Sequence, residues 1–224
     1  RLYQGWTWYG DPEFNLQFNG HESQMPDAKY GDCINGQNVF NVTKYFNANS
    51  DNTAILTSTK TLNQYAYYST VLIVIYETES EPYRQIWGNE GSDCLLSDYG
   101  ADLAVGYTMF DNVSAESLIS AEVTTVLQSG DNDNQNFVIF NGERVAKTLR
   151  RGSDPALFYY DVTAALQDGG NELGVDGGGE SYFNFASAIL EVTKLTASEA
   201  NFTANPTSGN APLNVKFTDT STGT

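Results

Sequence analysis

The sequence predicts an all-β protein built from two tandem β-sandwiches. Short apolar runs are separated by Asn, Thr, Ser and Gly, and long apolar repeats with helical spacing are missing. The chain carries 14 Tyr, 12 Phe and 3 Trp, enough aromatic volume to fill two cores. The most apolar run, residues 67–77, is β-branched and contains no Gly or Pro. We therefore expect it to be a central strand buried on both faces.

Strand-like segments follow one another through the first half of the chain. They comprise an aromatic segment, a segment that alternates polar and apolar residues, two shorter segments and the apolar run. In order, these are residues 2–9, 13–19, 39–46, 52–57 and 67–77. The polar stretch over residues 20–38 holds the only histidine, His21, together with Cys33.

The second half repeats motifs of the first half in the same order. The matched pairs are residues 18–20 and 140–142 (both Phe-Asn-Gly), 40–46 and 160–166, 52–56 and 171–175, and 67–77 and 185–192. The offset between the copies is about 116 to 122 residues throughout, as from residue 20 to residue 142. Four matches in one order predict two copies of one sandwich unit.

Each copy contains a short turn between two strands. Asn41 and Asp161 are suited to cap this turn, and Gly169 and Gly170 are suited to end it. The strand, turn and strand pattern resembles that of galactose-binding-like jelly-roll modules. The resemblance implies two jelly-roll-like sandwiches, which we place at residues 1–110 and 111–196.

A longer set of motifs resembles an uncharacterised domain family of the domain of unknown function 3344 type. The motifs lie at residues 2–6, 18–21, 41–43, 71–77, 82, 89–91, 140–142 and 161–163. The resemblance covers residues 1–193 and implies a secreted cell-surface protein of the kind found in methanogenic archaea. The family carries no known catalytic residues, so the resemblance transfers none.

Residues 197–224 form a linker and a truncated Ig-like segment. The pattern Pro-Thr-Ser-Gly-x-Ala-Pro, followed by Val-x-Phe-Thr-Asp-Thr-Ser, resembles the opening of a polycystic-kidney-disease (PKD) repeat. Such repeats are common in archaeal surface proteins. Two strands cannot bury a core alone, so we expect that the remainder is removed or disordered, or that this tail packs on a neighbour.

The net charge limits which molecules the chain can bind, and the cysteine content indicates the redox compartment in which it folds. A formal net charge of -17 disfavours nucleic acid and anionic membranes, attracts divalent cations and keeps the chain soluble. No apolar run is long enough to span a membrane, and both ends of the sequence look cut from something longer. Cys33 and Cys94 lie in loop-like sequence, which favours one disulfide in an oxidising compartment over two buried thiols.

Few side chains suggest chemistry. His21 has no Gly-x-Ser-x-Gly motif to accompany it, and acidic pairs arise by chance in a chain with 28 acidic residues. Asp131, Asp133 and Asn136 stack oxygen ligands in one loop and form a candidate Ca²⁺ site, with a polar hairpin turn as the alternative. A second candidate comprises Asp168, Asp176 and Glu180. The glycosylation sequons begin at Asn41, Asn112 and Asn201.

Three functional classes follow. We expect a structural subunit of an extracellular sheath, surface layer or filament that associates with copies of itself through strand edges. The alternative is a carbohydrate-binding or adhesin module that uses Trp6, Trp8 or Trp87 to stack on polysaccharide, although Trp6 and Trp8 share one strand face and could both be core. No feature of the sequence favours the third class, an enzyme.

Overall fold

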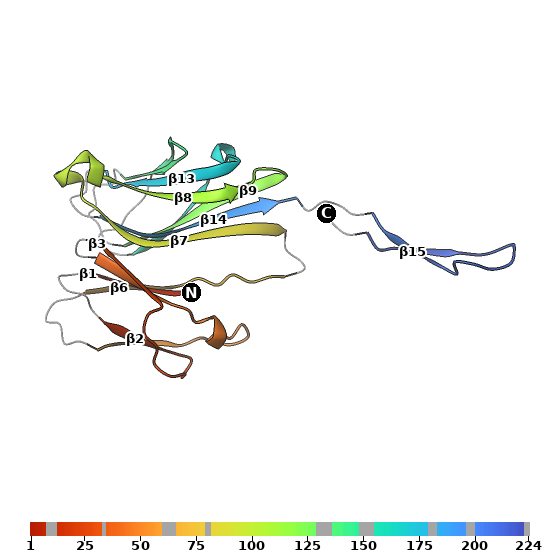
Figure 1. Ribbon diagram of the computed structural model, residues 1–224, viewed down its shortest axis with the longest axis horizontal. Coiled ribbons are helices and arrows are strands. Elements are labelled where there is room, and N and C mark those ends of the chain that lie inside the picture. Colours follow the sequence, from red (N-terminus) through yellow and green to blue (C-terminus); the bar gives the residue numbers. More distant parts are fainter. Residues whose placement is uncertain are drawn as a thin grey trace.

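The chain folds as a stack of antiparallel β-sheets (Figure 1). The computed structural model describes residues 1–7, 13–32, 35–59, 66–78, 82–128, 136–147, 155–178, 183–195 and 200–221. Within these ranges the regular elements are β-strands and short 3-10 turns. The predicted all-β sandwich class is confirmed.

The N-terminal unit contains a sheet with strand order β3-β4-β1-β6 and, opposite it, a sheet of β2 and β5. The strands are β1 (Leu2–Thr7), β2 (Phe14–Phe18), β3 (Ala28–Asp32), β4 (Asn35–Phe40), β5 (Ala54–Ser58) and β6 (Ala66–Leu72). The 3-10 turn η1 (Thr43–Tyr45) follows β4. The apolar side chains that close the space between the two sheets are Leu2, Leu16, Phe18, Phe40 and Val42.

The C-terminal unit has two sheets, with orders β12-β9-β14-β7 and β11-β10-β13-β8. Its strands are β7 (Tyr83–Leu95), β8 (Val105–Val113), β9 (Leu118–Gln128), β10 (Phe137–Phe140), β11 (Glu143–Lys147), β12 (Ala156–Asp161), β13 (Gly169–Asp176) and β14 (Phe183–Lys194). Its 3-10 turns are η2 (Ser97–Tyr99), η3 (Ala101–Leu103) and η4 (Thr163–Ala165). The core between these sheets is larger and includes Phe110, Val123, Phe140, Leu173 and Leu190.

Two sheets meet in the middle of the stack. The β3-β4-β1-β6 sheet faces the β12-β9-β14-β7 sheet, and β7 lies against both β3 and β4 (Figure 1). Both middle sheets are therefore covered on both faces. Each unit keeps its own apolar core, and the contact between the units is made by other side chains.

Strands β7 and β8 lie within or across the expected first unit, residues 1–110, yet they hydrogen-bond to strands of the second. β7 pairs with β14 from Leu95↔Phe183 to Tyr83↔Lys194, and β8 pairs with β13. The change from one set of sheets to the other therefore falls between β6 and β7. β7 is part of the C-terminal unit because it pairs along its whole length with β14. This pairing joins residues about 100 positions apart, so it cannot be predicted from neighbouring residues in the sequence.

The apolar run at residues 67–77 is not the buried central strand that its composition predicts. Its strand, β6, is the last in its sheet, and Leu72 and Ile75 are 38% and 65% exposed. The weaker copy of the run, β14, holds the central position, and its Leu190 and Val192 are fully buried. The prediction was wrong because burial depends on neighbouring strands, which β14 has on both edges.

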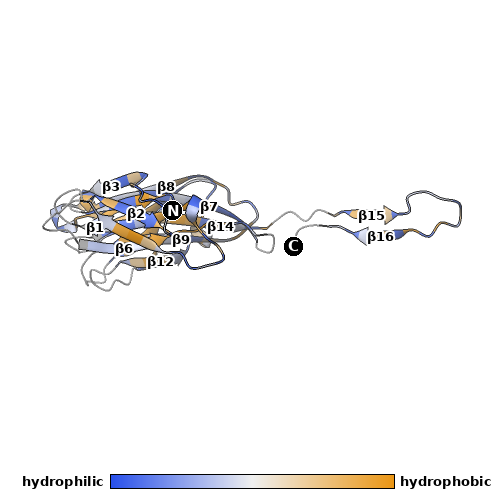
Figure 2. Ribbon diagram, turned by 90° about the horizontal axis from the view of Figure 1, so that it is seen from below, coloured by the Kyte–Doolittle hydropathy of each residue, from blue (hydrophilic) through white to orange (hydrophobic). Residues whose placement is uncertain are grey.

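The C-terminal hairpin lies apart from the stacked sheets (Figure 1, Figure 2). It consists of β15 (Phe202–Asn205) and β16 (Lys216–Asp219), which pair antiparallel. Phe202 and Phe217 contact each other edge to face at 5.6 Å between ring centroids, and both are exposed. The hairpin supplies two strands where the PKD resemblance implies two, and the PKD fold itself stays a prediction.

Candidate functional site

An asparagine with left-handed backbone geometry ends the β2 strand of the N-terminal unit. Asn19 has φ 49° and is followed by Gly20 with φ 73°, a turn geometry that Asn and Gly accept most readily. The Asn19 Nδ2 donates to the carbonyl oxygen of Tyr45 and to Asn52 Oδ1, both at 2.8 Å. The Asn19 Oδ1 accepts from the Thr53 N–H at 2.7 Å. One side chain thus ties β2, the turn after β4 and the start of β5 together.

The C-terminal unit contains the same turn. Asn141 has φ 51° and follows β10. Its Nδ2 donates to the carbonyl oxygen of Ala165 and to Asn171 Oδ1, both at 2.8 Å, and its Oδ1 accepts from the Glu172 N–H at 2.9 Å. The motif pairs that the sequence shows therefore occupy equivalent places in the two units, down to individual hydrogen bonds.

Strand pairing extends this equivalence to the central strands and shows where the units differ. β9 lies between β12 and β14 as β1 lies between β4 and β6. Beyond these strands, β7 covers the outer edge of β14 and β8 covers that of β13. Among the strands that the structure describes, none takes the corresponding places beside β6 and β5. The two units thus share their central strands, and among the described strands the N-terminal unit lacks the two covering strands and has β3 where the C-terminal unit has β11 on the other sheet.

The side chains next to the uncovered edge are exposed. Leu72 pairs with Leu2 as Leu190 pairs with Val123, which makes Leu72 and Leu190 equivalent. Leu72 is 38% exposed and Val74, two residues on, is 40% exposed, whereas Leu190 and Val192 are fully buried. Apolar surface that is core in one unit is therefore open to solvent in the other. We call the edges of β5 and β6, with Leu72 and Val74, the open side.

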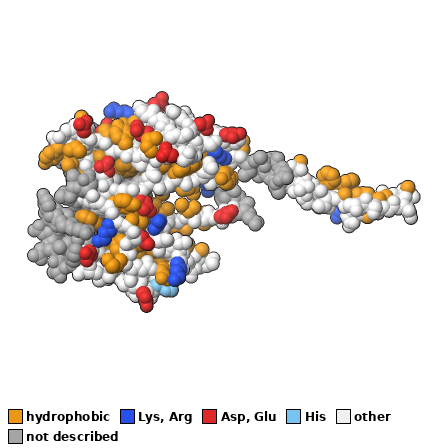
Figure 3. All heavy atoms as spheres, in the orientation of Figure 1, with side chains coloured by type: hydrophobic (Ala, Val, Ile, Leu, Met, Phe, Trp, Pro, Cys, Tyr) orange, Lys and Arg blue, Asp and Glu red, His pale blue; other side chains and the backbone are white. Residues whose placement is uncertain are grey.

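A cavity of about 260 Å³ adjoins the open side and is lined by residues of both units. Its walls are largely apolar and include Val42, Phe46, Leu72, Val74, Ile86 and Ile189. In the space-filling view, hydrophobic side chains lie along the middle of the body as well as over its upper layer (Figure 3). An apolar cavity with few polar groups suits an apolar side chain better than a charged ligand.

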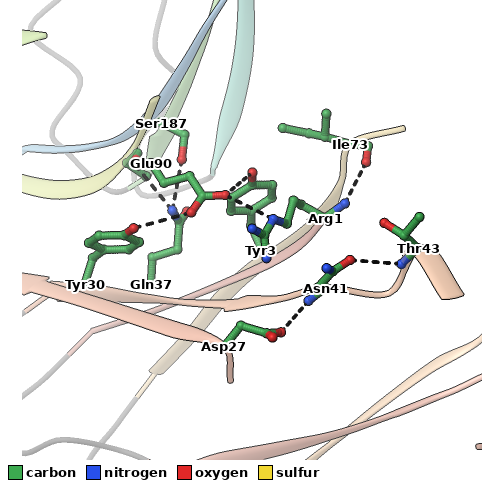
Figure 4. A network of polar contacts seen from close by, with 11 residues as sticks. Arg1, Tyr3, Asp27, Tyr30, Gln37, Asn41, Thr43, Ile73, Glu90 and Ser187 are labelled. Carbon is green, nitrogen blue, oxygen red and sulfur yellow. Dashed lines mark hydrogen bonds and ion pairs between the residues drawn. The ribbon is translucent and has the colours of Figure 1, made fainter. Parts of the chain in front are cut away.

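Polar side chains join the two units at the other end of this cavity (Figure 4). Glu90 on β7 accepts from the Tyr3 hydroxyl at 2.8 Å and from the Tyr30 hydroxyl at 3.4 Å, and the Arg1 Nε lies 3.7 Å from the same carboxylate. Burial and the Glu90 carboxylate raise the pKa of both tyrosines above their ordinary value. Both hydroxyls therefore remain protonated and act as donors.

A second polar contact crosses the interface at Gln37 on β4. Its Nε2 donates to Ser187 Oγ at 2.9 Å and lies 3.2 Å and 3.4 Å from the carbonyl oxygens of Gly91 and Ala186. Gln37 is fully buried. Because a buried amide is costly to leave without partners, this contact fixes how the two units stack. Sequence reasoning missed Gln37, Glu90 and their tyrosine partners, since no spacing rule links residues so far apart.

The predicted metal and disulfide residues are described only in part. Asp131, Asp133, Glu180 and Cys33 lie outside the described residues, while Asn136 and Cys94 are buried. In the described part of the chain, no group of three or more His, Cys, Asp or Glu side chains could hold a metal ion. The Ca²⁺ site and the Cys33–Cys94 pairing stay predictions.

The remaining candidates lie at separate places. Asn41, Asn112 and Asn201 are exposed, and the Asn41 Oδ1 accepts from the Thr43 N–H at 3.3 Å, as expected for a cap. His21 stacks on Tyr45, with 4.2 Å between ring centroids. Trp6 is buried and cannot stack on a sugar, whereas Trp8 lies outside the described residues.

A family described as "Protein of unknown function (DUF3344)" matches residues 1–193. The chain belongs to this family. The DUF3344 match ends within β14, so it covers both units and leaves out the C-terminal hairpin. None of the curated proteins matches the sequence. No helix in the described ranges is long and apolar enough to cross a membrane.

Two solved structures align with this DUF3344 chain at low identity. A β-glucuronidase from an uncultured Clostridium species is 12% identical, with 66% of this chain and 35% of that chain covered and a TM-score of 0.33. The structure of the infectious bursal disease virus Gx strain is 10% identical, with 86% and 56% covered and a TM-score of 0.27. The chain thus spans well under two thirds of either structure, and neither likeness bears on its function.

Proposed function

We propose that this DUF3344 chain is a structural subunit of an extracellular cell-surface assembly, such as a sheath, surface layer or filament. It associates with copies of itself through β-strand edges. The open side carries this proposal, because no described strand covers its strand edges, and they lie next to apolar residues whose equivalents in the C-terminal unit are buried. Soluble β proteins normally blunt such edges with charge, proline or bulges. The β1–β6 pairing has one bulge, between residues 67 and 69, and the stretch 70–76 contains no charge and no proline.

The charge of the chain is compatible with this role. A net charge of -17 keeps the subunit soluble and repels copies that approach at random. Association then requires a surface where charge is absent and backbone groups are available, as at a strand edge. The proposal assigns the chain no catalytic step and no resident cofactor.

Sedimentation velocity and electron microscopy of the full-length protein, over a range of concentrations in salt with and without Ca²⁺, test the proposal. We expect concentration-dependent assembly that Thr70→Lys on β6 weakens. Ser120→Lys is the matched control, because it adds the same charge at an exposed position on β9, a strand paired on both edges. A monomer under all conditions contradicts the proposal.

A carbohydrate-binding module is the second candidate. Tyr76 and Tyr83 are 74% and 53% exposed and line one groove together with Arg84 and Glu191. Exposed tyrosine rings beside charged side chains suit the stacking and hydrogen bonding of a sugar. Calorimetric titration with cell-wall polysaccharide tests this function, and Tyr83→Ala should abolish any heat that is specific to this groove.

A further inference from the structure

The backbone groups of β6 that point to the open side can be identified from its pairing with β1. Arg1 and Ile73 exchange both backbone hydrogen bonds, at 3.0 Å and 2.9 Å. Hydrogen-bonded and non-hydrogen-bonded pairs alternate along an antiparallel ladder. The N–H and C=O groups of Thr70, Leu72 and Val74 therefore point away from β1, toward the open side. They form a row of donors and acceptors that suits another strand.

This stretch of edge carries no charge. Residues 66–76 contain no Asp, Glu, Lys or Arg, although the chain as a whole has a formal net charge of -17. Two identical acidic chains repel each other least where charge is absent. The edge of β6 at Thr70 and Leu72 thus combines backbone groups that face no described strand with a low electrostatic cost for the approach of a second copy.

Exposed apolar side chains extend this surface onto the neighbouring sheet. Leu157 and Tyr159 on β12 are 43% and 63% exposed. β12 lies on the same side of the body as β6 in the view from below (Figure 2). A strand added beside β6 therefore lies near these side chains as well as near Leu72 and Val74.

We infer that two copies pair antiparallel across a twofold axis at Leu72, so that the end of β6 in each copy lies opposite residues 73–76 of the other, which follow the strand. Leu72 then faces its own counterpart, and Thr70 faces Val74 of the partner subunit. A strand paired with itself in this way matches every donor with an acceptor, and the twofold contact is closed and self-complementary. The inference rests on the proposed function and specifies the edge and the register of one contact in the assembly. Because a twofold contact closes at the dimer, growth into a sheath or filament requires a second contact.

Disulfide trapping in the full-length protein tests the register. Directly opposed residues of a hydrogen-bonded antiparallel pair lie about 5.5 Å apart at Cα, within the usual disulfide range of about 4.4–6.8 Å. Leu72→Cys should therefore form a covalent dimer under mild oxidation. Thr70→Cys alone and Val74→Cys alone should not, because four residue steps put each about 14 Å from its counterpart. A mixture of Thr70→Cys and Val74→Cys should again crosslink. The unaltered chain gives the background from Cys33 and Cys94.

Hydrogen exchange of the unaltered chain gives a readout that no substitution can disturb. The amides of Thr70, Leu72 and Val74 should exchange about fivefold more slowly at a total chain concentration ten times the dissociation constant of the dimer, where about one fifth of the chains remain monomeric. The amide of Val71 should change little. Assembly without these crosslinks or this protection overturns the inference and leaves the proposed function standing. A monomer at all concentrations overturns both. Equal protection at all concentrations points to a strand of the same polypeptide and also overturns the inference.

Discussion

Asn19 and Asn141 hold the same place in two units of one chain and donate to the same two kinds of acceptor at 2.8 Å. In each unit the acceptors are a carbonyl oxygen at the end of the 3-10 turn and the side-chain oxygen of a second asparagine. The same hydrogen-bonded turn therefore occurs in both units, and it allows their strands to be matched. The match shows that β7 and β8 have no described counterpart beside β6 and β5.

Replacing either asparagine should destabilise its own unit. Asn19→Ala and Asn141→Ala each remove hydrogen bonds to partly buried and exposed backbone groups, at a cost of about 0.5–1.5 kcal/mol per bond. Chemical denaturation monitored by fluorescence measures the loss. Asn112→Ala is the control, because Asn112 also has a left-handed φ, of 58°, but is exposed on β8. Equal losses at all three positions would show that backbone strain, and not the hydrogen bonds, is responsible.

The cap of the second turn should make part of the stability depend on pH. Hydrogen bonds from the Thr163 side chain and from its backbone N–H hold the pKa of Asp161 below its ordinary value of 3.8. The folded state therefore gains stability above that value and loses it as the pH falls through the lowered pKa. Asp161→Asn, which copies Asn41 of the first unit, should remove this dependence. Urea denaturation between pH 2 and pH 6 tests it, and an unchanged profile contradicts it.

The Tyr3 hydroxyl should stabilise the contact between the units. Tyr3→Phe removes the 2.8 Å hydrogen bond to Glu90 and leaves a partly buried carboxylate with one donor fewer. We expect a loss of about 1.5–3 kcal/mol, as for other hydrogen bonds to charged groups. Tyr99→Phe, at a 76% exposed position, is the control and should be neutral by differential scanning calorimetry. An unchanged stability of Tyr3→Phe would mean that the hydrogen bond to Glu90 does not stabilise the contact between the units.

Close packing should exclude a side chain at Gly36. An added Cβ would lie 2.2 Å from the Trp6 ring and 2.7 Å from the Tyr30 carbonyl oxygen. Gly36→Ala should therefore cost about 1–3 kcal/mol, as for other overpacked sites. Gly88→Ala places a Cβ in open space on β7, so thermal melts should show little or no loss for it. Similar melting temperatures for the two variants would contradict the packing around Trp6.

The Cys33–Cys94 disulfide remains a prediction from the sequence. If it forms, it closes a loop of about 60 residues and stabilises the fold by about 4 kcal/mol in the chain-entropy estimate. Peptide mapping of the natural protein without reductant should recover the two cysteines in one linked pair. Two thiols that react with an alkylating agent would exclude the bond, and a linked dimer would place it between subunits.

The sequence determined the features that depend on residues close together in the chain. Asn-Gly turns accept left-handed φ values locally, and a cap bonds within two residues, so the turns at Asn19 and Asn141 and the caps at Asn41 and Asp161 could be predicted in matching order. Alternating apolar patterns likewise predicted an all-β protein.

Only the tertiary structure decided which apolar strand is buried and how the units meet. Residues 71–75 form a longer unbroken aliphatic run than any within residues 185–192, yet β14 is the buried strand. The reason is that β7 and β8 cover its side of the sandwich and no described strand does so for β6. The bond from Gln37 to Ser187 joins residues 150 positions apart. Burial and long-range pairing depend on which strands are adjacent in the folded protein, and the local sequence does not specify these neighbours.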